Sequence, residues 1–137
     1  MMLTLNSKKG KANGSQEVVY NFLADFRNFS NLMSSDMMQQ VVITDDTVRF
    51  SITGLGNVGL KISERHPNEL MVIKATEDSA ADFTFHVRIA VLTENTSQVE
   101  IDLDANLNMF LEMMARSPLQ KFLDLMADKI ETIDFAG

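Results

Sequence analysis

The sequence predicts an α+β protein in which one long C-terminal helix crosses a curved, seven-stranded antiparallel sheet. From Leu119 to Ile133, apolar residues recur at steps of three and four, as on one face of a helix. Between residues 41 and 105, apolar and polar residues alternate, as in strands with one buried face. No linker or repeat interrupts the chain, so a single domain, 1–137, is expected.

The first third of the chain is expected to hold one strand followed by two short helices. Residues 2–12 are expected to form the strand, and the lysines within it would keep a sheet edge solvated. Ser15 can cap the first helix, and a second helical piece is expected over 27–33. The inner side of the first helix would carry Val18, Val19, Phe22, Leu23 and Phe26.

The middle of the chain reads as two hairpins. A two-residue turn at Asp45-Asp46 would place Ile43 opposite Val48, apolar against apolar. The next two strands, 58–62 and 70–75, flank a turn at Pro67-Asn68. Their pairing would place Ile62 opposite Ile73.

The last two strands show the clearest alternation, over 83–91 and 99–105. Matching their apolar faces places Val91 opposite Val99, with a loop over 94–96. On the outer face, this register places Arg88 opposite Asp102 and predicts a salt bridge there.

The C-terminal helix is predicted to begin at Pro118, because proline fits the first helical position, where its missing N–H costs nothing. Ser117 could cap this start, with Gln120 completing a capping box. A helix over 118–134 would be about 25 Å long, enough to cross a sheet face.

Composition narrows the classes of partner. A net charge of −7 opposes nucleic-acid binding. No apolar run approaches the ~20 residues that a membrane span needs. The N-terminus lacks a basic segment followed by an apolar one, so the cytoplasm is the expected location. Cysteine is absent, which excludes disulfides and cysteine-ligated metals.

No catalytic or metal-binding residue is predicted, and no cofactor. Residues 54–59 fit the pattern G-x-G-x-x-G, but a strand follows them where a dinucleotide site needs a helix. His66 falls at a turn and His86 on the outer face, so they do not converge on a metal. The carboxylates of strand 99–105 lie on its solvated face.

The ten methionines are unusual, and methionine adapts either to gaps in a core or to a deformable ligand pocket. A straight helix cannot touch a curved sheet everywhere, so a gap is expected between them. The residues expected to line this gap and to contact a ligand are Phe50, Ile52, Leu60, Phe85, Val87, Met113, Met114, Phe122 and Met126.

This order of elements resembles the helix-grip fold of the SRPBCC or START-like superfamily, which includes birch-pollen-allergen-like proteins and polyketide cyclases. The first helix and its continuation, 15–33, are similar to that superfamily, with Ser34 where a proline is common. The segments 104–110, 113–115 and 118–123 are similar to a bacterial subgroup of it. The resemblance implies the fold but no shared catalytic motif.

Three functions follow as hypotheses. The leading one is binding of a small hydrophobic molecule, lipid-like or polycyclic, between the sheet and the terminal helix. The second is a polyketide cyclase-like or hydrolase-like enzyme, for which the imaginable inward polar residues are Tyr20, Asn106, Asn108 and Arg116. The third is an interaction protein like the chaperone activators of this fold, and a homodimer is possible.

Overall fold

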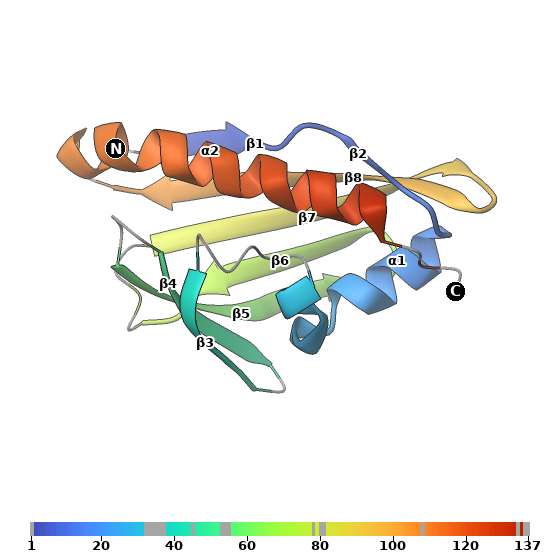
Figure 1. The fold of residues 1–137 in the computed structure, drawn as a ribbon, viewed down its shortest axis with the longest axis horizontal. Coiled ribbons are helices and arrows are strands. Elements are labelled where there is room, and N and C mark those ends of the chain that lie inside the picture. Colours follow the sequence, from blue (N-terminus) through green and yellow to red (C-terminus); the bar gives the residue numbers. More distant parts are fainter. Residues whose placement is uncertain are drawn as a thin grey trace.

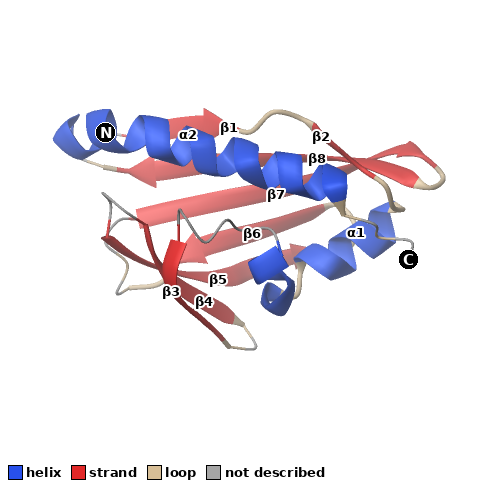
Figure 2. Cartoon of the chain, viewed as in Figure 1, coloured by secondary structure: helices blue, strands red, loops and turns tan. Residues whose placement is uncertain are grey.

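The computed structural model describes residues 2–31, 38–44, 46–52, 56–77, 79, 82–107, 109–133 and 135. In these ranges, a twisted antiparallel sheet carries one long helix, α2 (Met109–Thr132), along one of its faces (Figure 1). A shorter helix, α1 (Gln16–Leu23), lies beside the C-terminal end of α2 (Figure 2). This is the predicted α+β arrangement, with a helix laid over the apolar face of a sheet.

The sheet runs in the order β1-β8-β7-β6-β5-β4-β3, and β2 also pairs with β8. The strands are β1 (Met2–Asn6), β2 (Gly10–Ala12), β3 (Met38–Ile43), β4 (Thr47–Ile52), β5 (Gly56–His66), β6 (Leu70–Ala75), β7 (Asp82–Thr93) and β8 (Thr96–Asn106). The described strands therefore number eight, because the first predicted strand, 2–12, is split in two.

Ser7 causes that split. Its backbone N–H donates to the Ile101 carbonyl at 2.8 Å, and its hydroxyl accepts from the Ile101 N–H at 2.9 Å. The same hydroxyl donates to the Lys8 carbonyl at 2.8 Å. A side chain thus takes the place of one backbone acceptor in the ladder, and the chain leaves the sheet until Gly10.

The helices after β2 match the prediction only in part. The Ser15 hydroxyl accepts from the Val18 N–H at 3.3 Å, which confirms the predicted cap of α1. The second piece is a 3-10 helix, η1 (Phe26–Asn31), and it begins one residue earlier than expected. Leu32 and Met33, the predicted end of this piece, lie outside the described residues.

Two of the predicted strand registers are confirmed, and one is wrong. Ile43 pairs with Val48, and Ile62 with Ile73, as expected; Asp45 of the first turn lies outside the described residues. In the last hairpin, however, Val99 pairs with Ile89 rather than Val91.

The register of the last hairpin is shifted by two residues. Its turn is Glu94-Asn95, and an irregularity between Val91 and Thr93 absorbs the odd residue. A shift of two keeps every apolar side chain on the same face, so face matching alone could not detect it. Arg88 lies opposite Glu100, yet its guanidinium still forms the predicted salt bridge with Asp102, at 3.2 Å.

The predicted start of the C-terminal helix is wrong, because α2 begins at Met109 and contains Pro118. An internal proline removes one helical hydrogen bond and crowds the carbonyl four residues earlier. The apolar stripe nevertheless extends back through Ala115, which is buried, so packing on the sheet favours helix before the proline. Ser117 is exposed within the helix and does not cap it.

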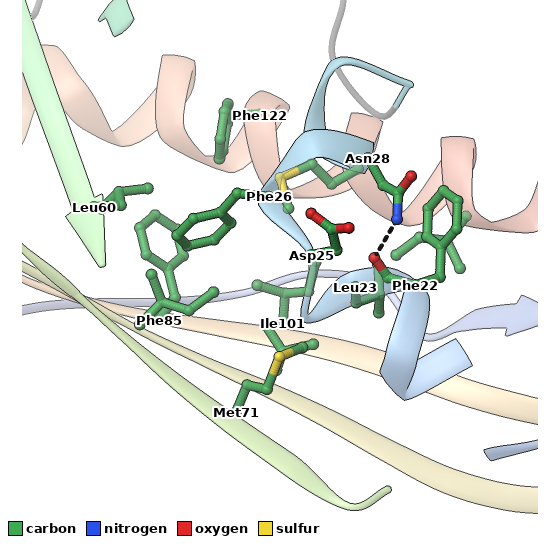
Figure 3. Close-up of a pocket in the computed structure, with 14 residues that line it drawn as sticks. Phe22, Leu23, Asp25, Phe26, Asn28, Leu60, Met71, Phe85, Ile101 and Phe122 are labelled. Atoms are coloured by element: carbon green, nitrogen blue, oxygen red, sulfur yellow. Dashed lines mark hydrogen bonds between the residues drawn. The ribbon is translucent and has the colours of Figure 1, made fainter. Parts of the chain in front are cut away.

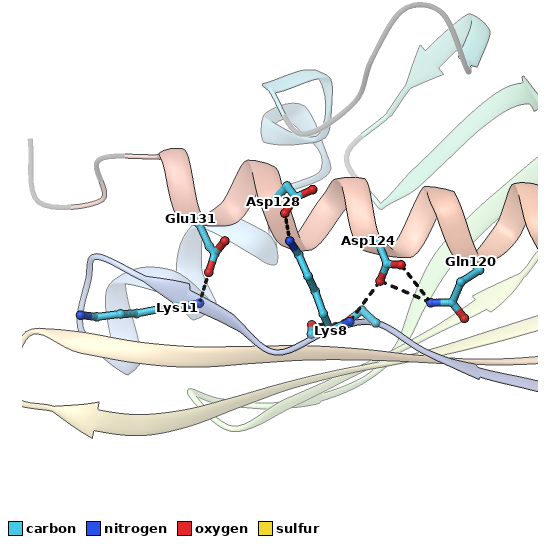
Figure 4. A network of polar contacts seen from close by, with 7 residues as sticks. Lys8, Lys11, Gln120, Asp124, Asp128 and Glu131 are labelled. Atoms are coloured by element: carbon cyan, nitrogen blue, oxygen red, sulfur yellow. Dashed lines mark hydrogen bonds and ion pairs between the residues drawn. The ribbon is translucent and has the colours of Figure 1, made fainter.

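Polar side chains on α2 hold the β1–β2 edge of the sheet (Figure 4). Three bonds reach the edge backbone: from Gln120 to the Asn6 carbonyl at 2.9 Å, from the Lys8 N–H to Asp124 at 3.1 Å, and from the Lys11 N–H to Glu131 at 3.2 Å. Lys8 also pairs with Asp128, whose hydrogen bond raises the pKa of the lysine. The helix therefore covers an edge that would otherwise offer free backbone groups.

Candidate functional site

A cavity of about 40 Å³ lies where three walls meet (Figure 3). One wall is the inner face of strands β5 to β8, the second is α2, and the third is the segment from α1 through η1. Twelve of the fourteen lining residues are apolar: Phe22, Leu23, Phe26, Leu60, Met71, Ile73, Phe85, Val87, Ile101, Phe122, Met126 and Ile130. The other two are Asp25 and Asn28.

Phe122 lies at the centre of an aromatic group beside the cavity. Its ring stacks on Phe50, with 6.3 Å between centroids and 16° between planes. Phe85 lies at the same centroid distance, tilted by 51°. Such offset and tilted pairs add about 0.5–1.5 kcal/mol beyond the area they bury. The sheet and α2 are thus joined by rings at one end of the cavity.

The cavity is small for a ligand site. Pockets for drug-sized molecules are roughly 300–1,000 Å³, whereas this one has room for only a few atoms. Two of its walls, however, carry methionines, Met71 on the sheet and Met126 on α2. Methionine has three rotatable bonds and no branch, so these side chains can change shape at low cost.

Asp25 lies between α1 and η1 and is 38% exposed, so it lies at the boundary between cavity and solvent. Its Oδ1 accepts from the Arg27 backbone N–H at 2.9 Å and from the Arg27 Nε at 3.1 Å. These bonds, the backbone one first, lower the pKa of the Asp25 carboxyl below its ordinary value. Asp25 therefore caps η1 and stays ionised at neutral pH.

Asn28 follows one 3-10 turn later. Its backbone N–H donates to the Asp25 carbonyl at 3.0 Å, and its side-chain amide donates to the Phe22 carbonyl at 3.0 Å. Residues three apart in a 3-10 helix lie above one another. The two polar residues of the lining therefore come from the same side of one turn (Figure 3).

The structure brings most of the sequence-predicted site residues together. Leu60, Phe85, Val87, Phe122 and Met126 line the cavity, and Phe50 is buried against Phe122. The Ile52 side chain lies outside what the structure describes.

Met113 and Met114 do not join the predicted site. They are 76% and 53% exposed, and Met113 lies in a surface hollow that Leu5 of β1 also lines. Because Pro118 does not begin the helix, both belong to the same helix as Ala115 and Phe122. The side chains of Met113 and Met114 lie outside the buried stripe to which Ala115 and Phe122 belong.

The α1–η1 wall was not predicted as part of the site. The sequence did place Phe22, Leu23 and Phe26 on the inner side of a helix, but without a cavity beneath them. Asp25 carried one usable signal, since an aspartate just before a short helical segment is a typical cap. The sequence could not show that Asp25 lines a cavity together with residues of the sheet, which begin 35 residues later, at Leu60.

The polar residues considered for an enzyme lie elsewhere. Tyr20 is buried outside the lining, and its hydroxyl has no hydrogen-bond partner among the described residues. Asn106 is exposed, and Arg116 pairs with Glu112 at 3.2 Å. Asn108 lies outside the described residues.

The glycines of segment 54–59 that the structure describes have a structural role in the sheet. Gly56 begins β5 with a φ of 114°, and Gly59 lies within that strand; Gly54 is outside the described residues. A Cβ atom on Gly59 would collide with the Thr76 hydroxyl, so glycine allows the chain after β6 to approach.

Two features are absent from the described ranges. No three His, Cys, Asp or Glu side chains in them gather as a metal site requires. None of the described helices combines the length and the apolar character that crossing a membrane demands.

Sequence comparisons find no match, either among models of protein families or among curated proteins. Solved structures do match. Norcoclaurine synthase from Thalictrum flavum, in complex with dopamine and hydroxybenzaldehyde, has a TM-score of 0.71 at 8% identity, over 96% of this chain and 86% of that one.

Two more structures are similar over nearly their whole length. A START superfamily protein from Mycobacterium smegmatis has a TM-score of 0.67 at 14% identity, over 96% of this chain and 94% of that one. An aromatase/cyclase from a Streptomyces species has a TM-score of 0.66 at 12% identity, over 100% and 99%. Identities this low are evidence of fold alone, and this chain shares the helix-grip fold of these three proteins.

Proposed function

We propose that the protein binds a small hydrophobic molecule in the cavity between the sheet, α2 and the α1–η1 segment. One observation carries the proposal: a gap remains where these three elements meet, and twelve of its fourteen lining residues are apolar. Similarity of fold supports it, because the norcoclaurine synthase structure holds two small aromatic molecules, dopamine and hydroxybenzaldehyde.

Binding requires the cavity to expand. Met71 and Met126, which line two of its walls, can change rotamer to make room. A ligand that buries about 200 Å² of apolar surface would gain roughly 5 kcal/mol from burial. Ordering of the ligand and repacking of side chains would offset part of that gain. Moderate affinity is therefore expected.

An enzyme of the same fold, polyketide cyclase-like or hydrolase-like, is the second candidate. Asp25 favours it, as the one ionisable side chain among the described lining residues. A general base works best when its pKa lies near the working pH. The pKa of Asp25 is lowered instead, which makes it a weak base and leaves binding as the better-supported function.

Two variants on one strand test the binding proposal. Val87 and Ile89 are both buried on the inner face of β7, but only Val87 lines the cavity. Phenylalanine at either position overpacks the core, at about 1–3 kcal/mol. In a titration with N-phenyl-1-naphthylamine, a neutral fluorophore that brightens in apolar surroundings, Val87→Phe should weaken binding tenfold or more. Ile89→Phe should leave it within threefold of wild type.

Either of two results would contradict the proposal. One is a Val87→Phe variant that binds the fluorophore as tightly as the wild type. The other is a wild-type protein that gives no saturable signal and yields no apolar molecule when the freshly purified protein is extracted with organic solvent.

A further inference from the structure

Phe135, which follows α2, packs against both ends of α1. Its ring meets the Phe22 ring edge to face, with 5.1 Å between the centroids and 87° between the planes. At the other end, just before α1, a Cβ atom on Gly14 would lie 2.6 Å from the Phe135 Cβ atom and 3.2 Å from its Cγ atom. Only glycine therefore leaves room for Phe135 to lie where it does.

The two contacts of Phe135 connect different parts of the molecule. Gly14 is tied to the sheet, because its carbonyl accepts a 2.8 Å hydrogen bond from the buried hydroxyl of Ser97 in β8. Phe22 lines the cavity (Figure 3), whereas Phe135 is not among the lining residues. Phe135 thus lies outside the cavity, between a residue bonded to the sheet and a ring of the α1–η1 wall.

The Phe22 ring is one of the side chains that limit the cavity. A space of about 40 Å³ is smaller than most ligands, so some of the lining has to move when a ligand binds. Phe22 and Phe135 are both only partly buried, so neither ring would have to move into the close-packed core. With Phe135 in contact, however, the space beside Phe22 outside the cavity is already filled.

We propose that Phe135 is a positioning residue of the site: it holds the Phe22 ring against the cavity and so limits the size of the ligand that fits. Phe135 touches no ligand and acts through Phe22. Removing it should tighten the binding of a ligand larger than the cavity, because Phe22 can then withdraw without displacing a packed ring. This inference rests on the proposed function and adds a residue from outside the lining.

A double-mutant cycle tests the inference, with N-phenyl-1-naphthylamine as the ligand. Phe135→Ala should bind the fluorophore about fivefold more tightly than the wild type, and Phe22→Ala, which removes the ring itself, at least as tightly. In the Phe22→Ala background, Phe135→Ala should change the affinity by less than about twofold, because the ring through which it acts is gone.

The matched control is Ile133→Ala. Ile133 also follows α2 and is partly buried against the same core, but it does not line the cavity. Urea unfolding should show lower stability for both Ile133→Ala and Phe135→Ala, and only Phe135→Ala should bind the fluorophore more tightly. A merely structural role of Phe135 would lower stability without raising affinity.

The outcomes separate this inference from the proposed function. A Phe135→Ala affinity that is weaker than wild type, or within about twofold of it, would overturn the inference and leave the proposed function standing. An equal effect of Phe135→Ala with and without Phe22 would do the same. If Phe135→Ala does not fold, Phe135→Leu replaces it in the cycle, with the same signs expected. A wild-type protein that does not bind the fluorophore would contradict both.

Discussion

Asp25 shows how one side chain can serve the fold and the site together. Its Oδ1 caps η1 by accepting from the Arg27 backbone N–H, and the residue also belongs to the lining of the cavity. The sequence analysis did not select it, since an isolated aspartate between two apolar runs is usually a cap and nothing more. Its second role arises only when the sheet lies beneath it.

The same residue gives a prediction about titration. The native state lowers the Asp25 pKa, so this carboxylate stabilises the fold above the ordinary value of 3.8, and that contribution is lost as pH falls through the native pKa. In a carbon-13 NMR titration of the carboxyl groups, the Asp25 midpoint should lie below 3.8.

The matched variant is Arg27→Ala, which removes the guanidinium bond and keeps the backbone one. Its midpoint should rise only part of the way toward 3.8, because the backbone bond is the larger cause of the lowering. A midpoint at or above 3.8 in the wild type would show that Arg27 does not hold this carboxylate.

At the scale of elements, the sequence predicted strands well and their ends poorly. Alternation identified the faces of β7 and β8, but a register shifted by two preserves every face, so only the turn and the irregularity at Val91 decide it. The predicted start of the C-terminal helix was wrong for a related reason. Pro118 has two readings, a first helical residue or an interior proline, and tertiary packing selects the second.

The two readings of Pro118 predict opposite stability changes. Within a helix, Pro118→Ala should raise the free energy of unfolding by about 1–3 kcal/mol, because alanine restores a hydrogen bond and removes the clash. Its neighbour is the control. Ser117→Ala should change stability by less than about 0.5 kcal/mol at an exposed helical position, but would cost about 1 kcal/mol if Ser117 were the cap.

Urea unfolding followed by circular dichroism measures both changes. A destabilising Ser117→Ala together with a neutral Pro118→Ala would mean that the helix begins at Pro118 after all.

At the scale of the whole molecule, the cavity follows from a mismatch between a curved sheet and a straight helix, which the sequence analysis anticipated. Five of its predicted residues line the cavity, because strand alternation and the stripe after Pro118 were both read correctly. The third wall and the small volume of about 40 Å³ were beyond prediction. Both the third wall and the volume depend on how α1 and η1 pack against the sheet and on which side-chain rotamers fill the space between them.

The most direct test uses the methionines of the protein as probes. Met71 and Met126 line the cavity, whereas Met113 and Met114 are exposed on α2 outside its lining and serve as internal controls. The protein is labelled with carbon-13 at the methionine methyl groups and titrated with 1-dodecanol. The account predicts saturable shifts of Met71 and Met126 at one common concentration, with Met113 and Met114 unmoved. Saturable shifts confined to Met113 and Met114, or none at Met71 and Met126, would contradict it.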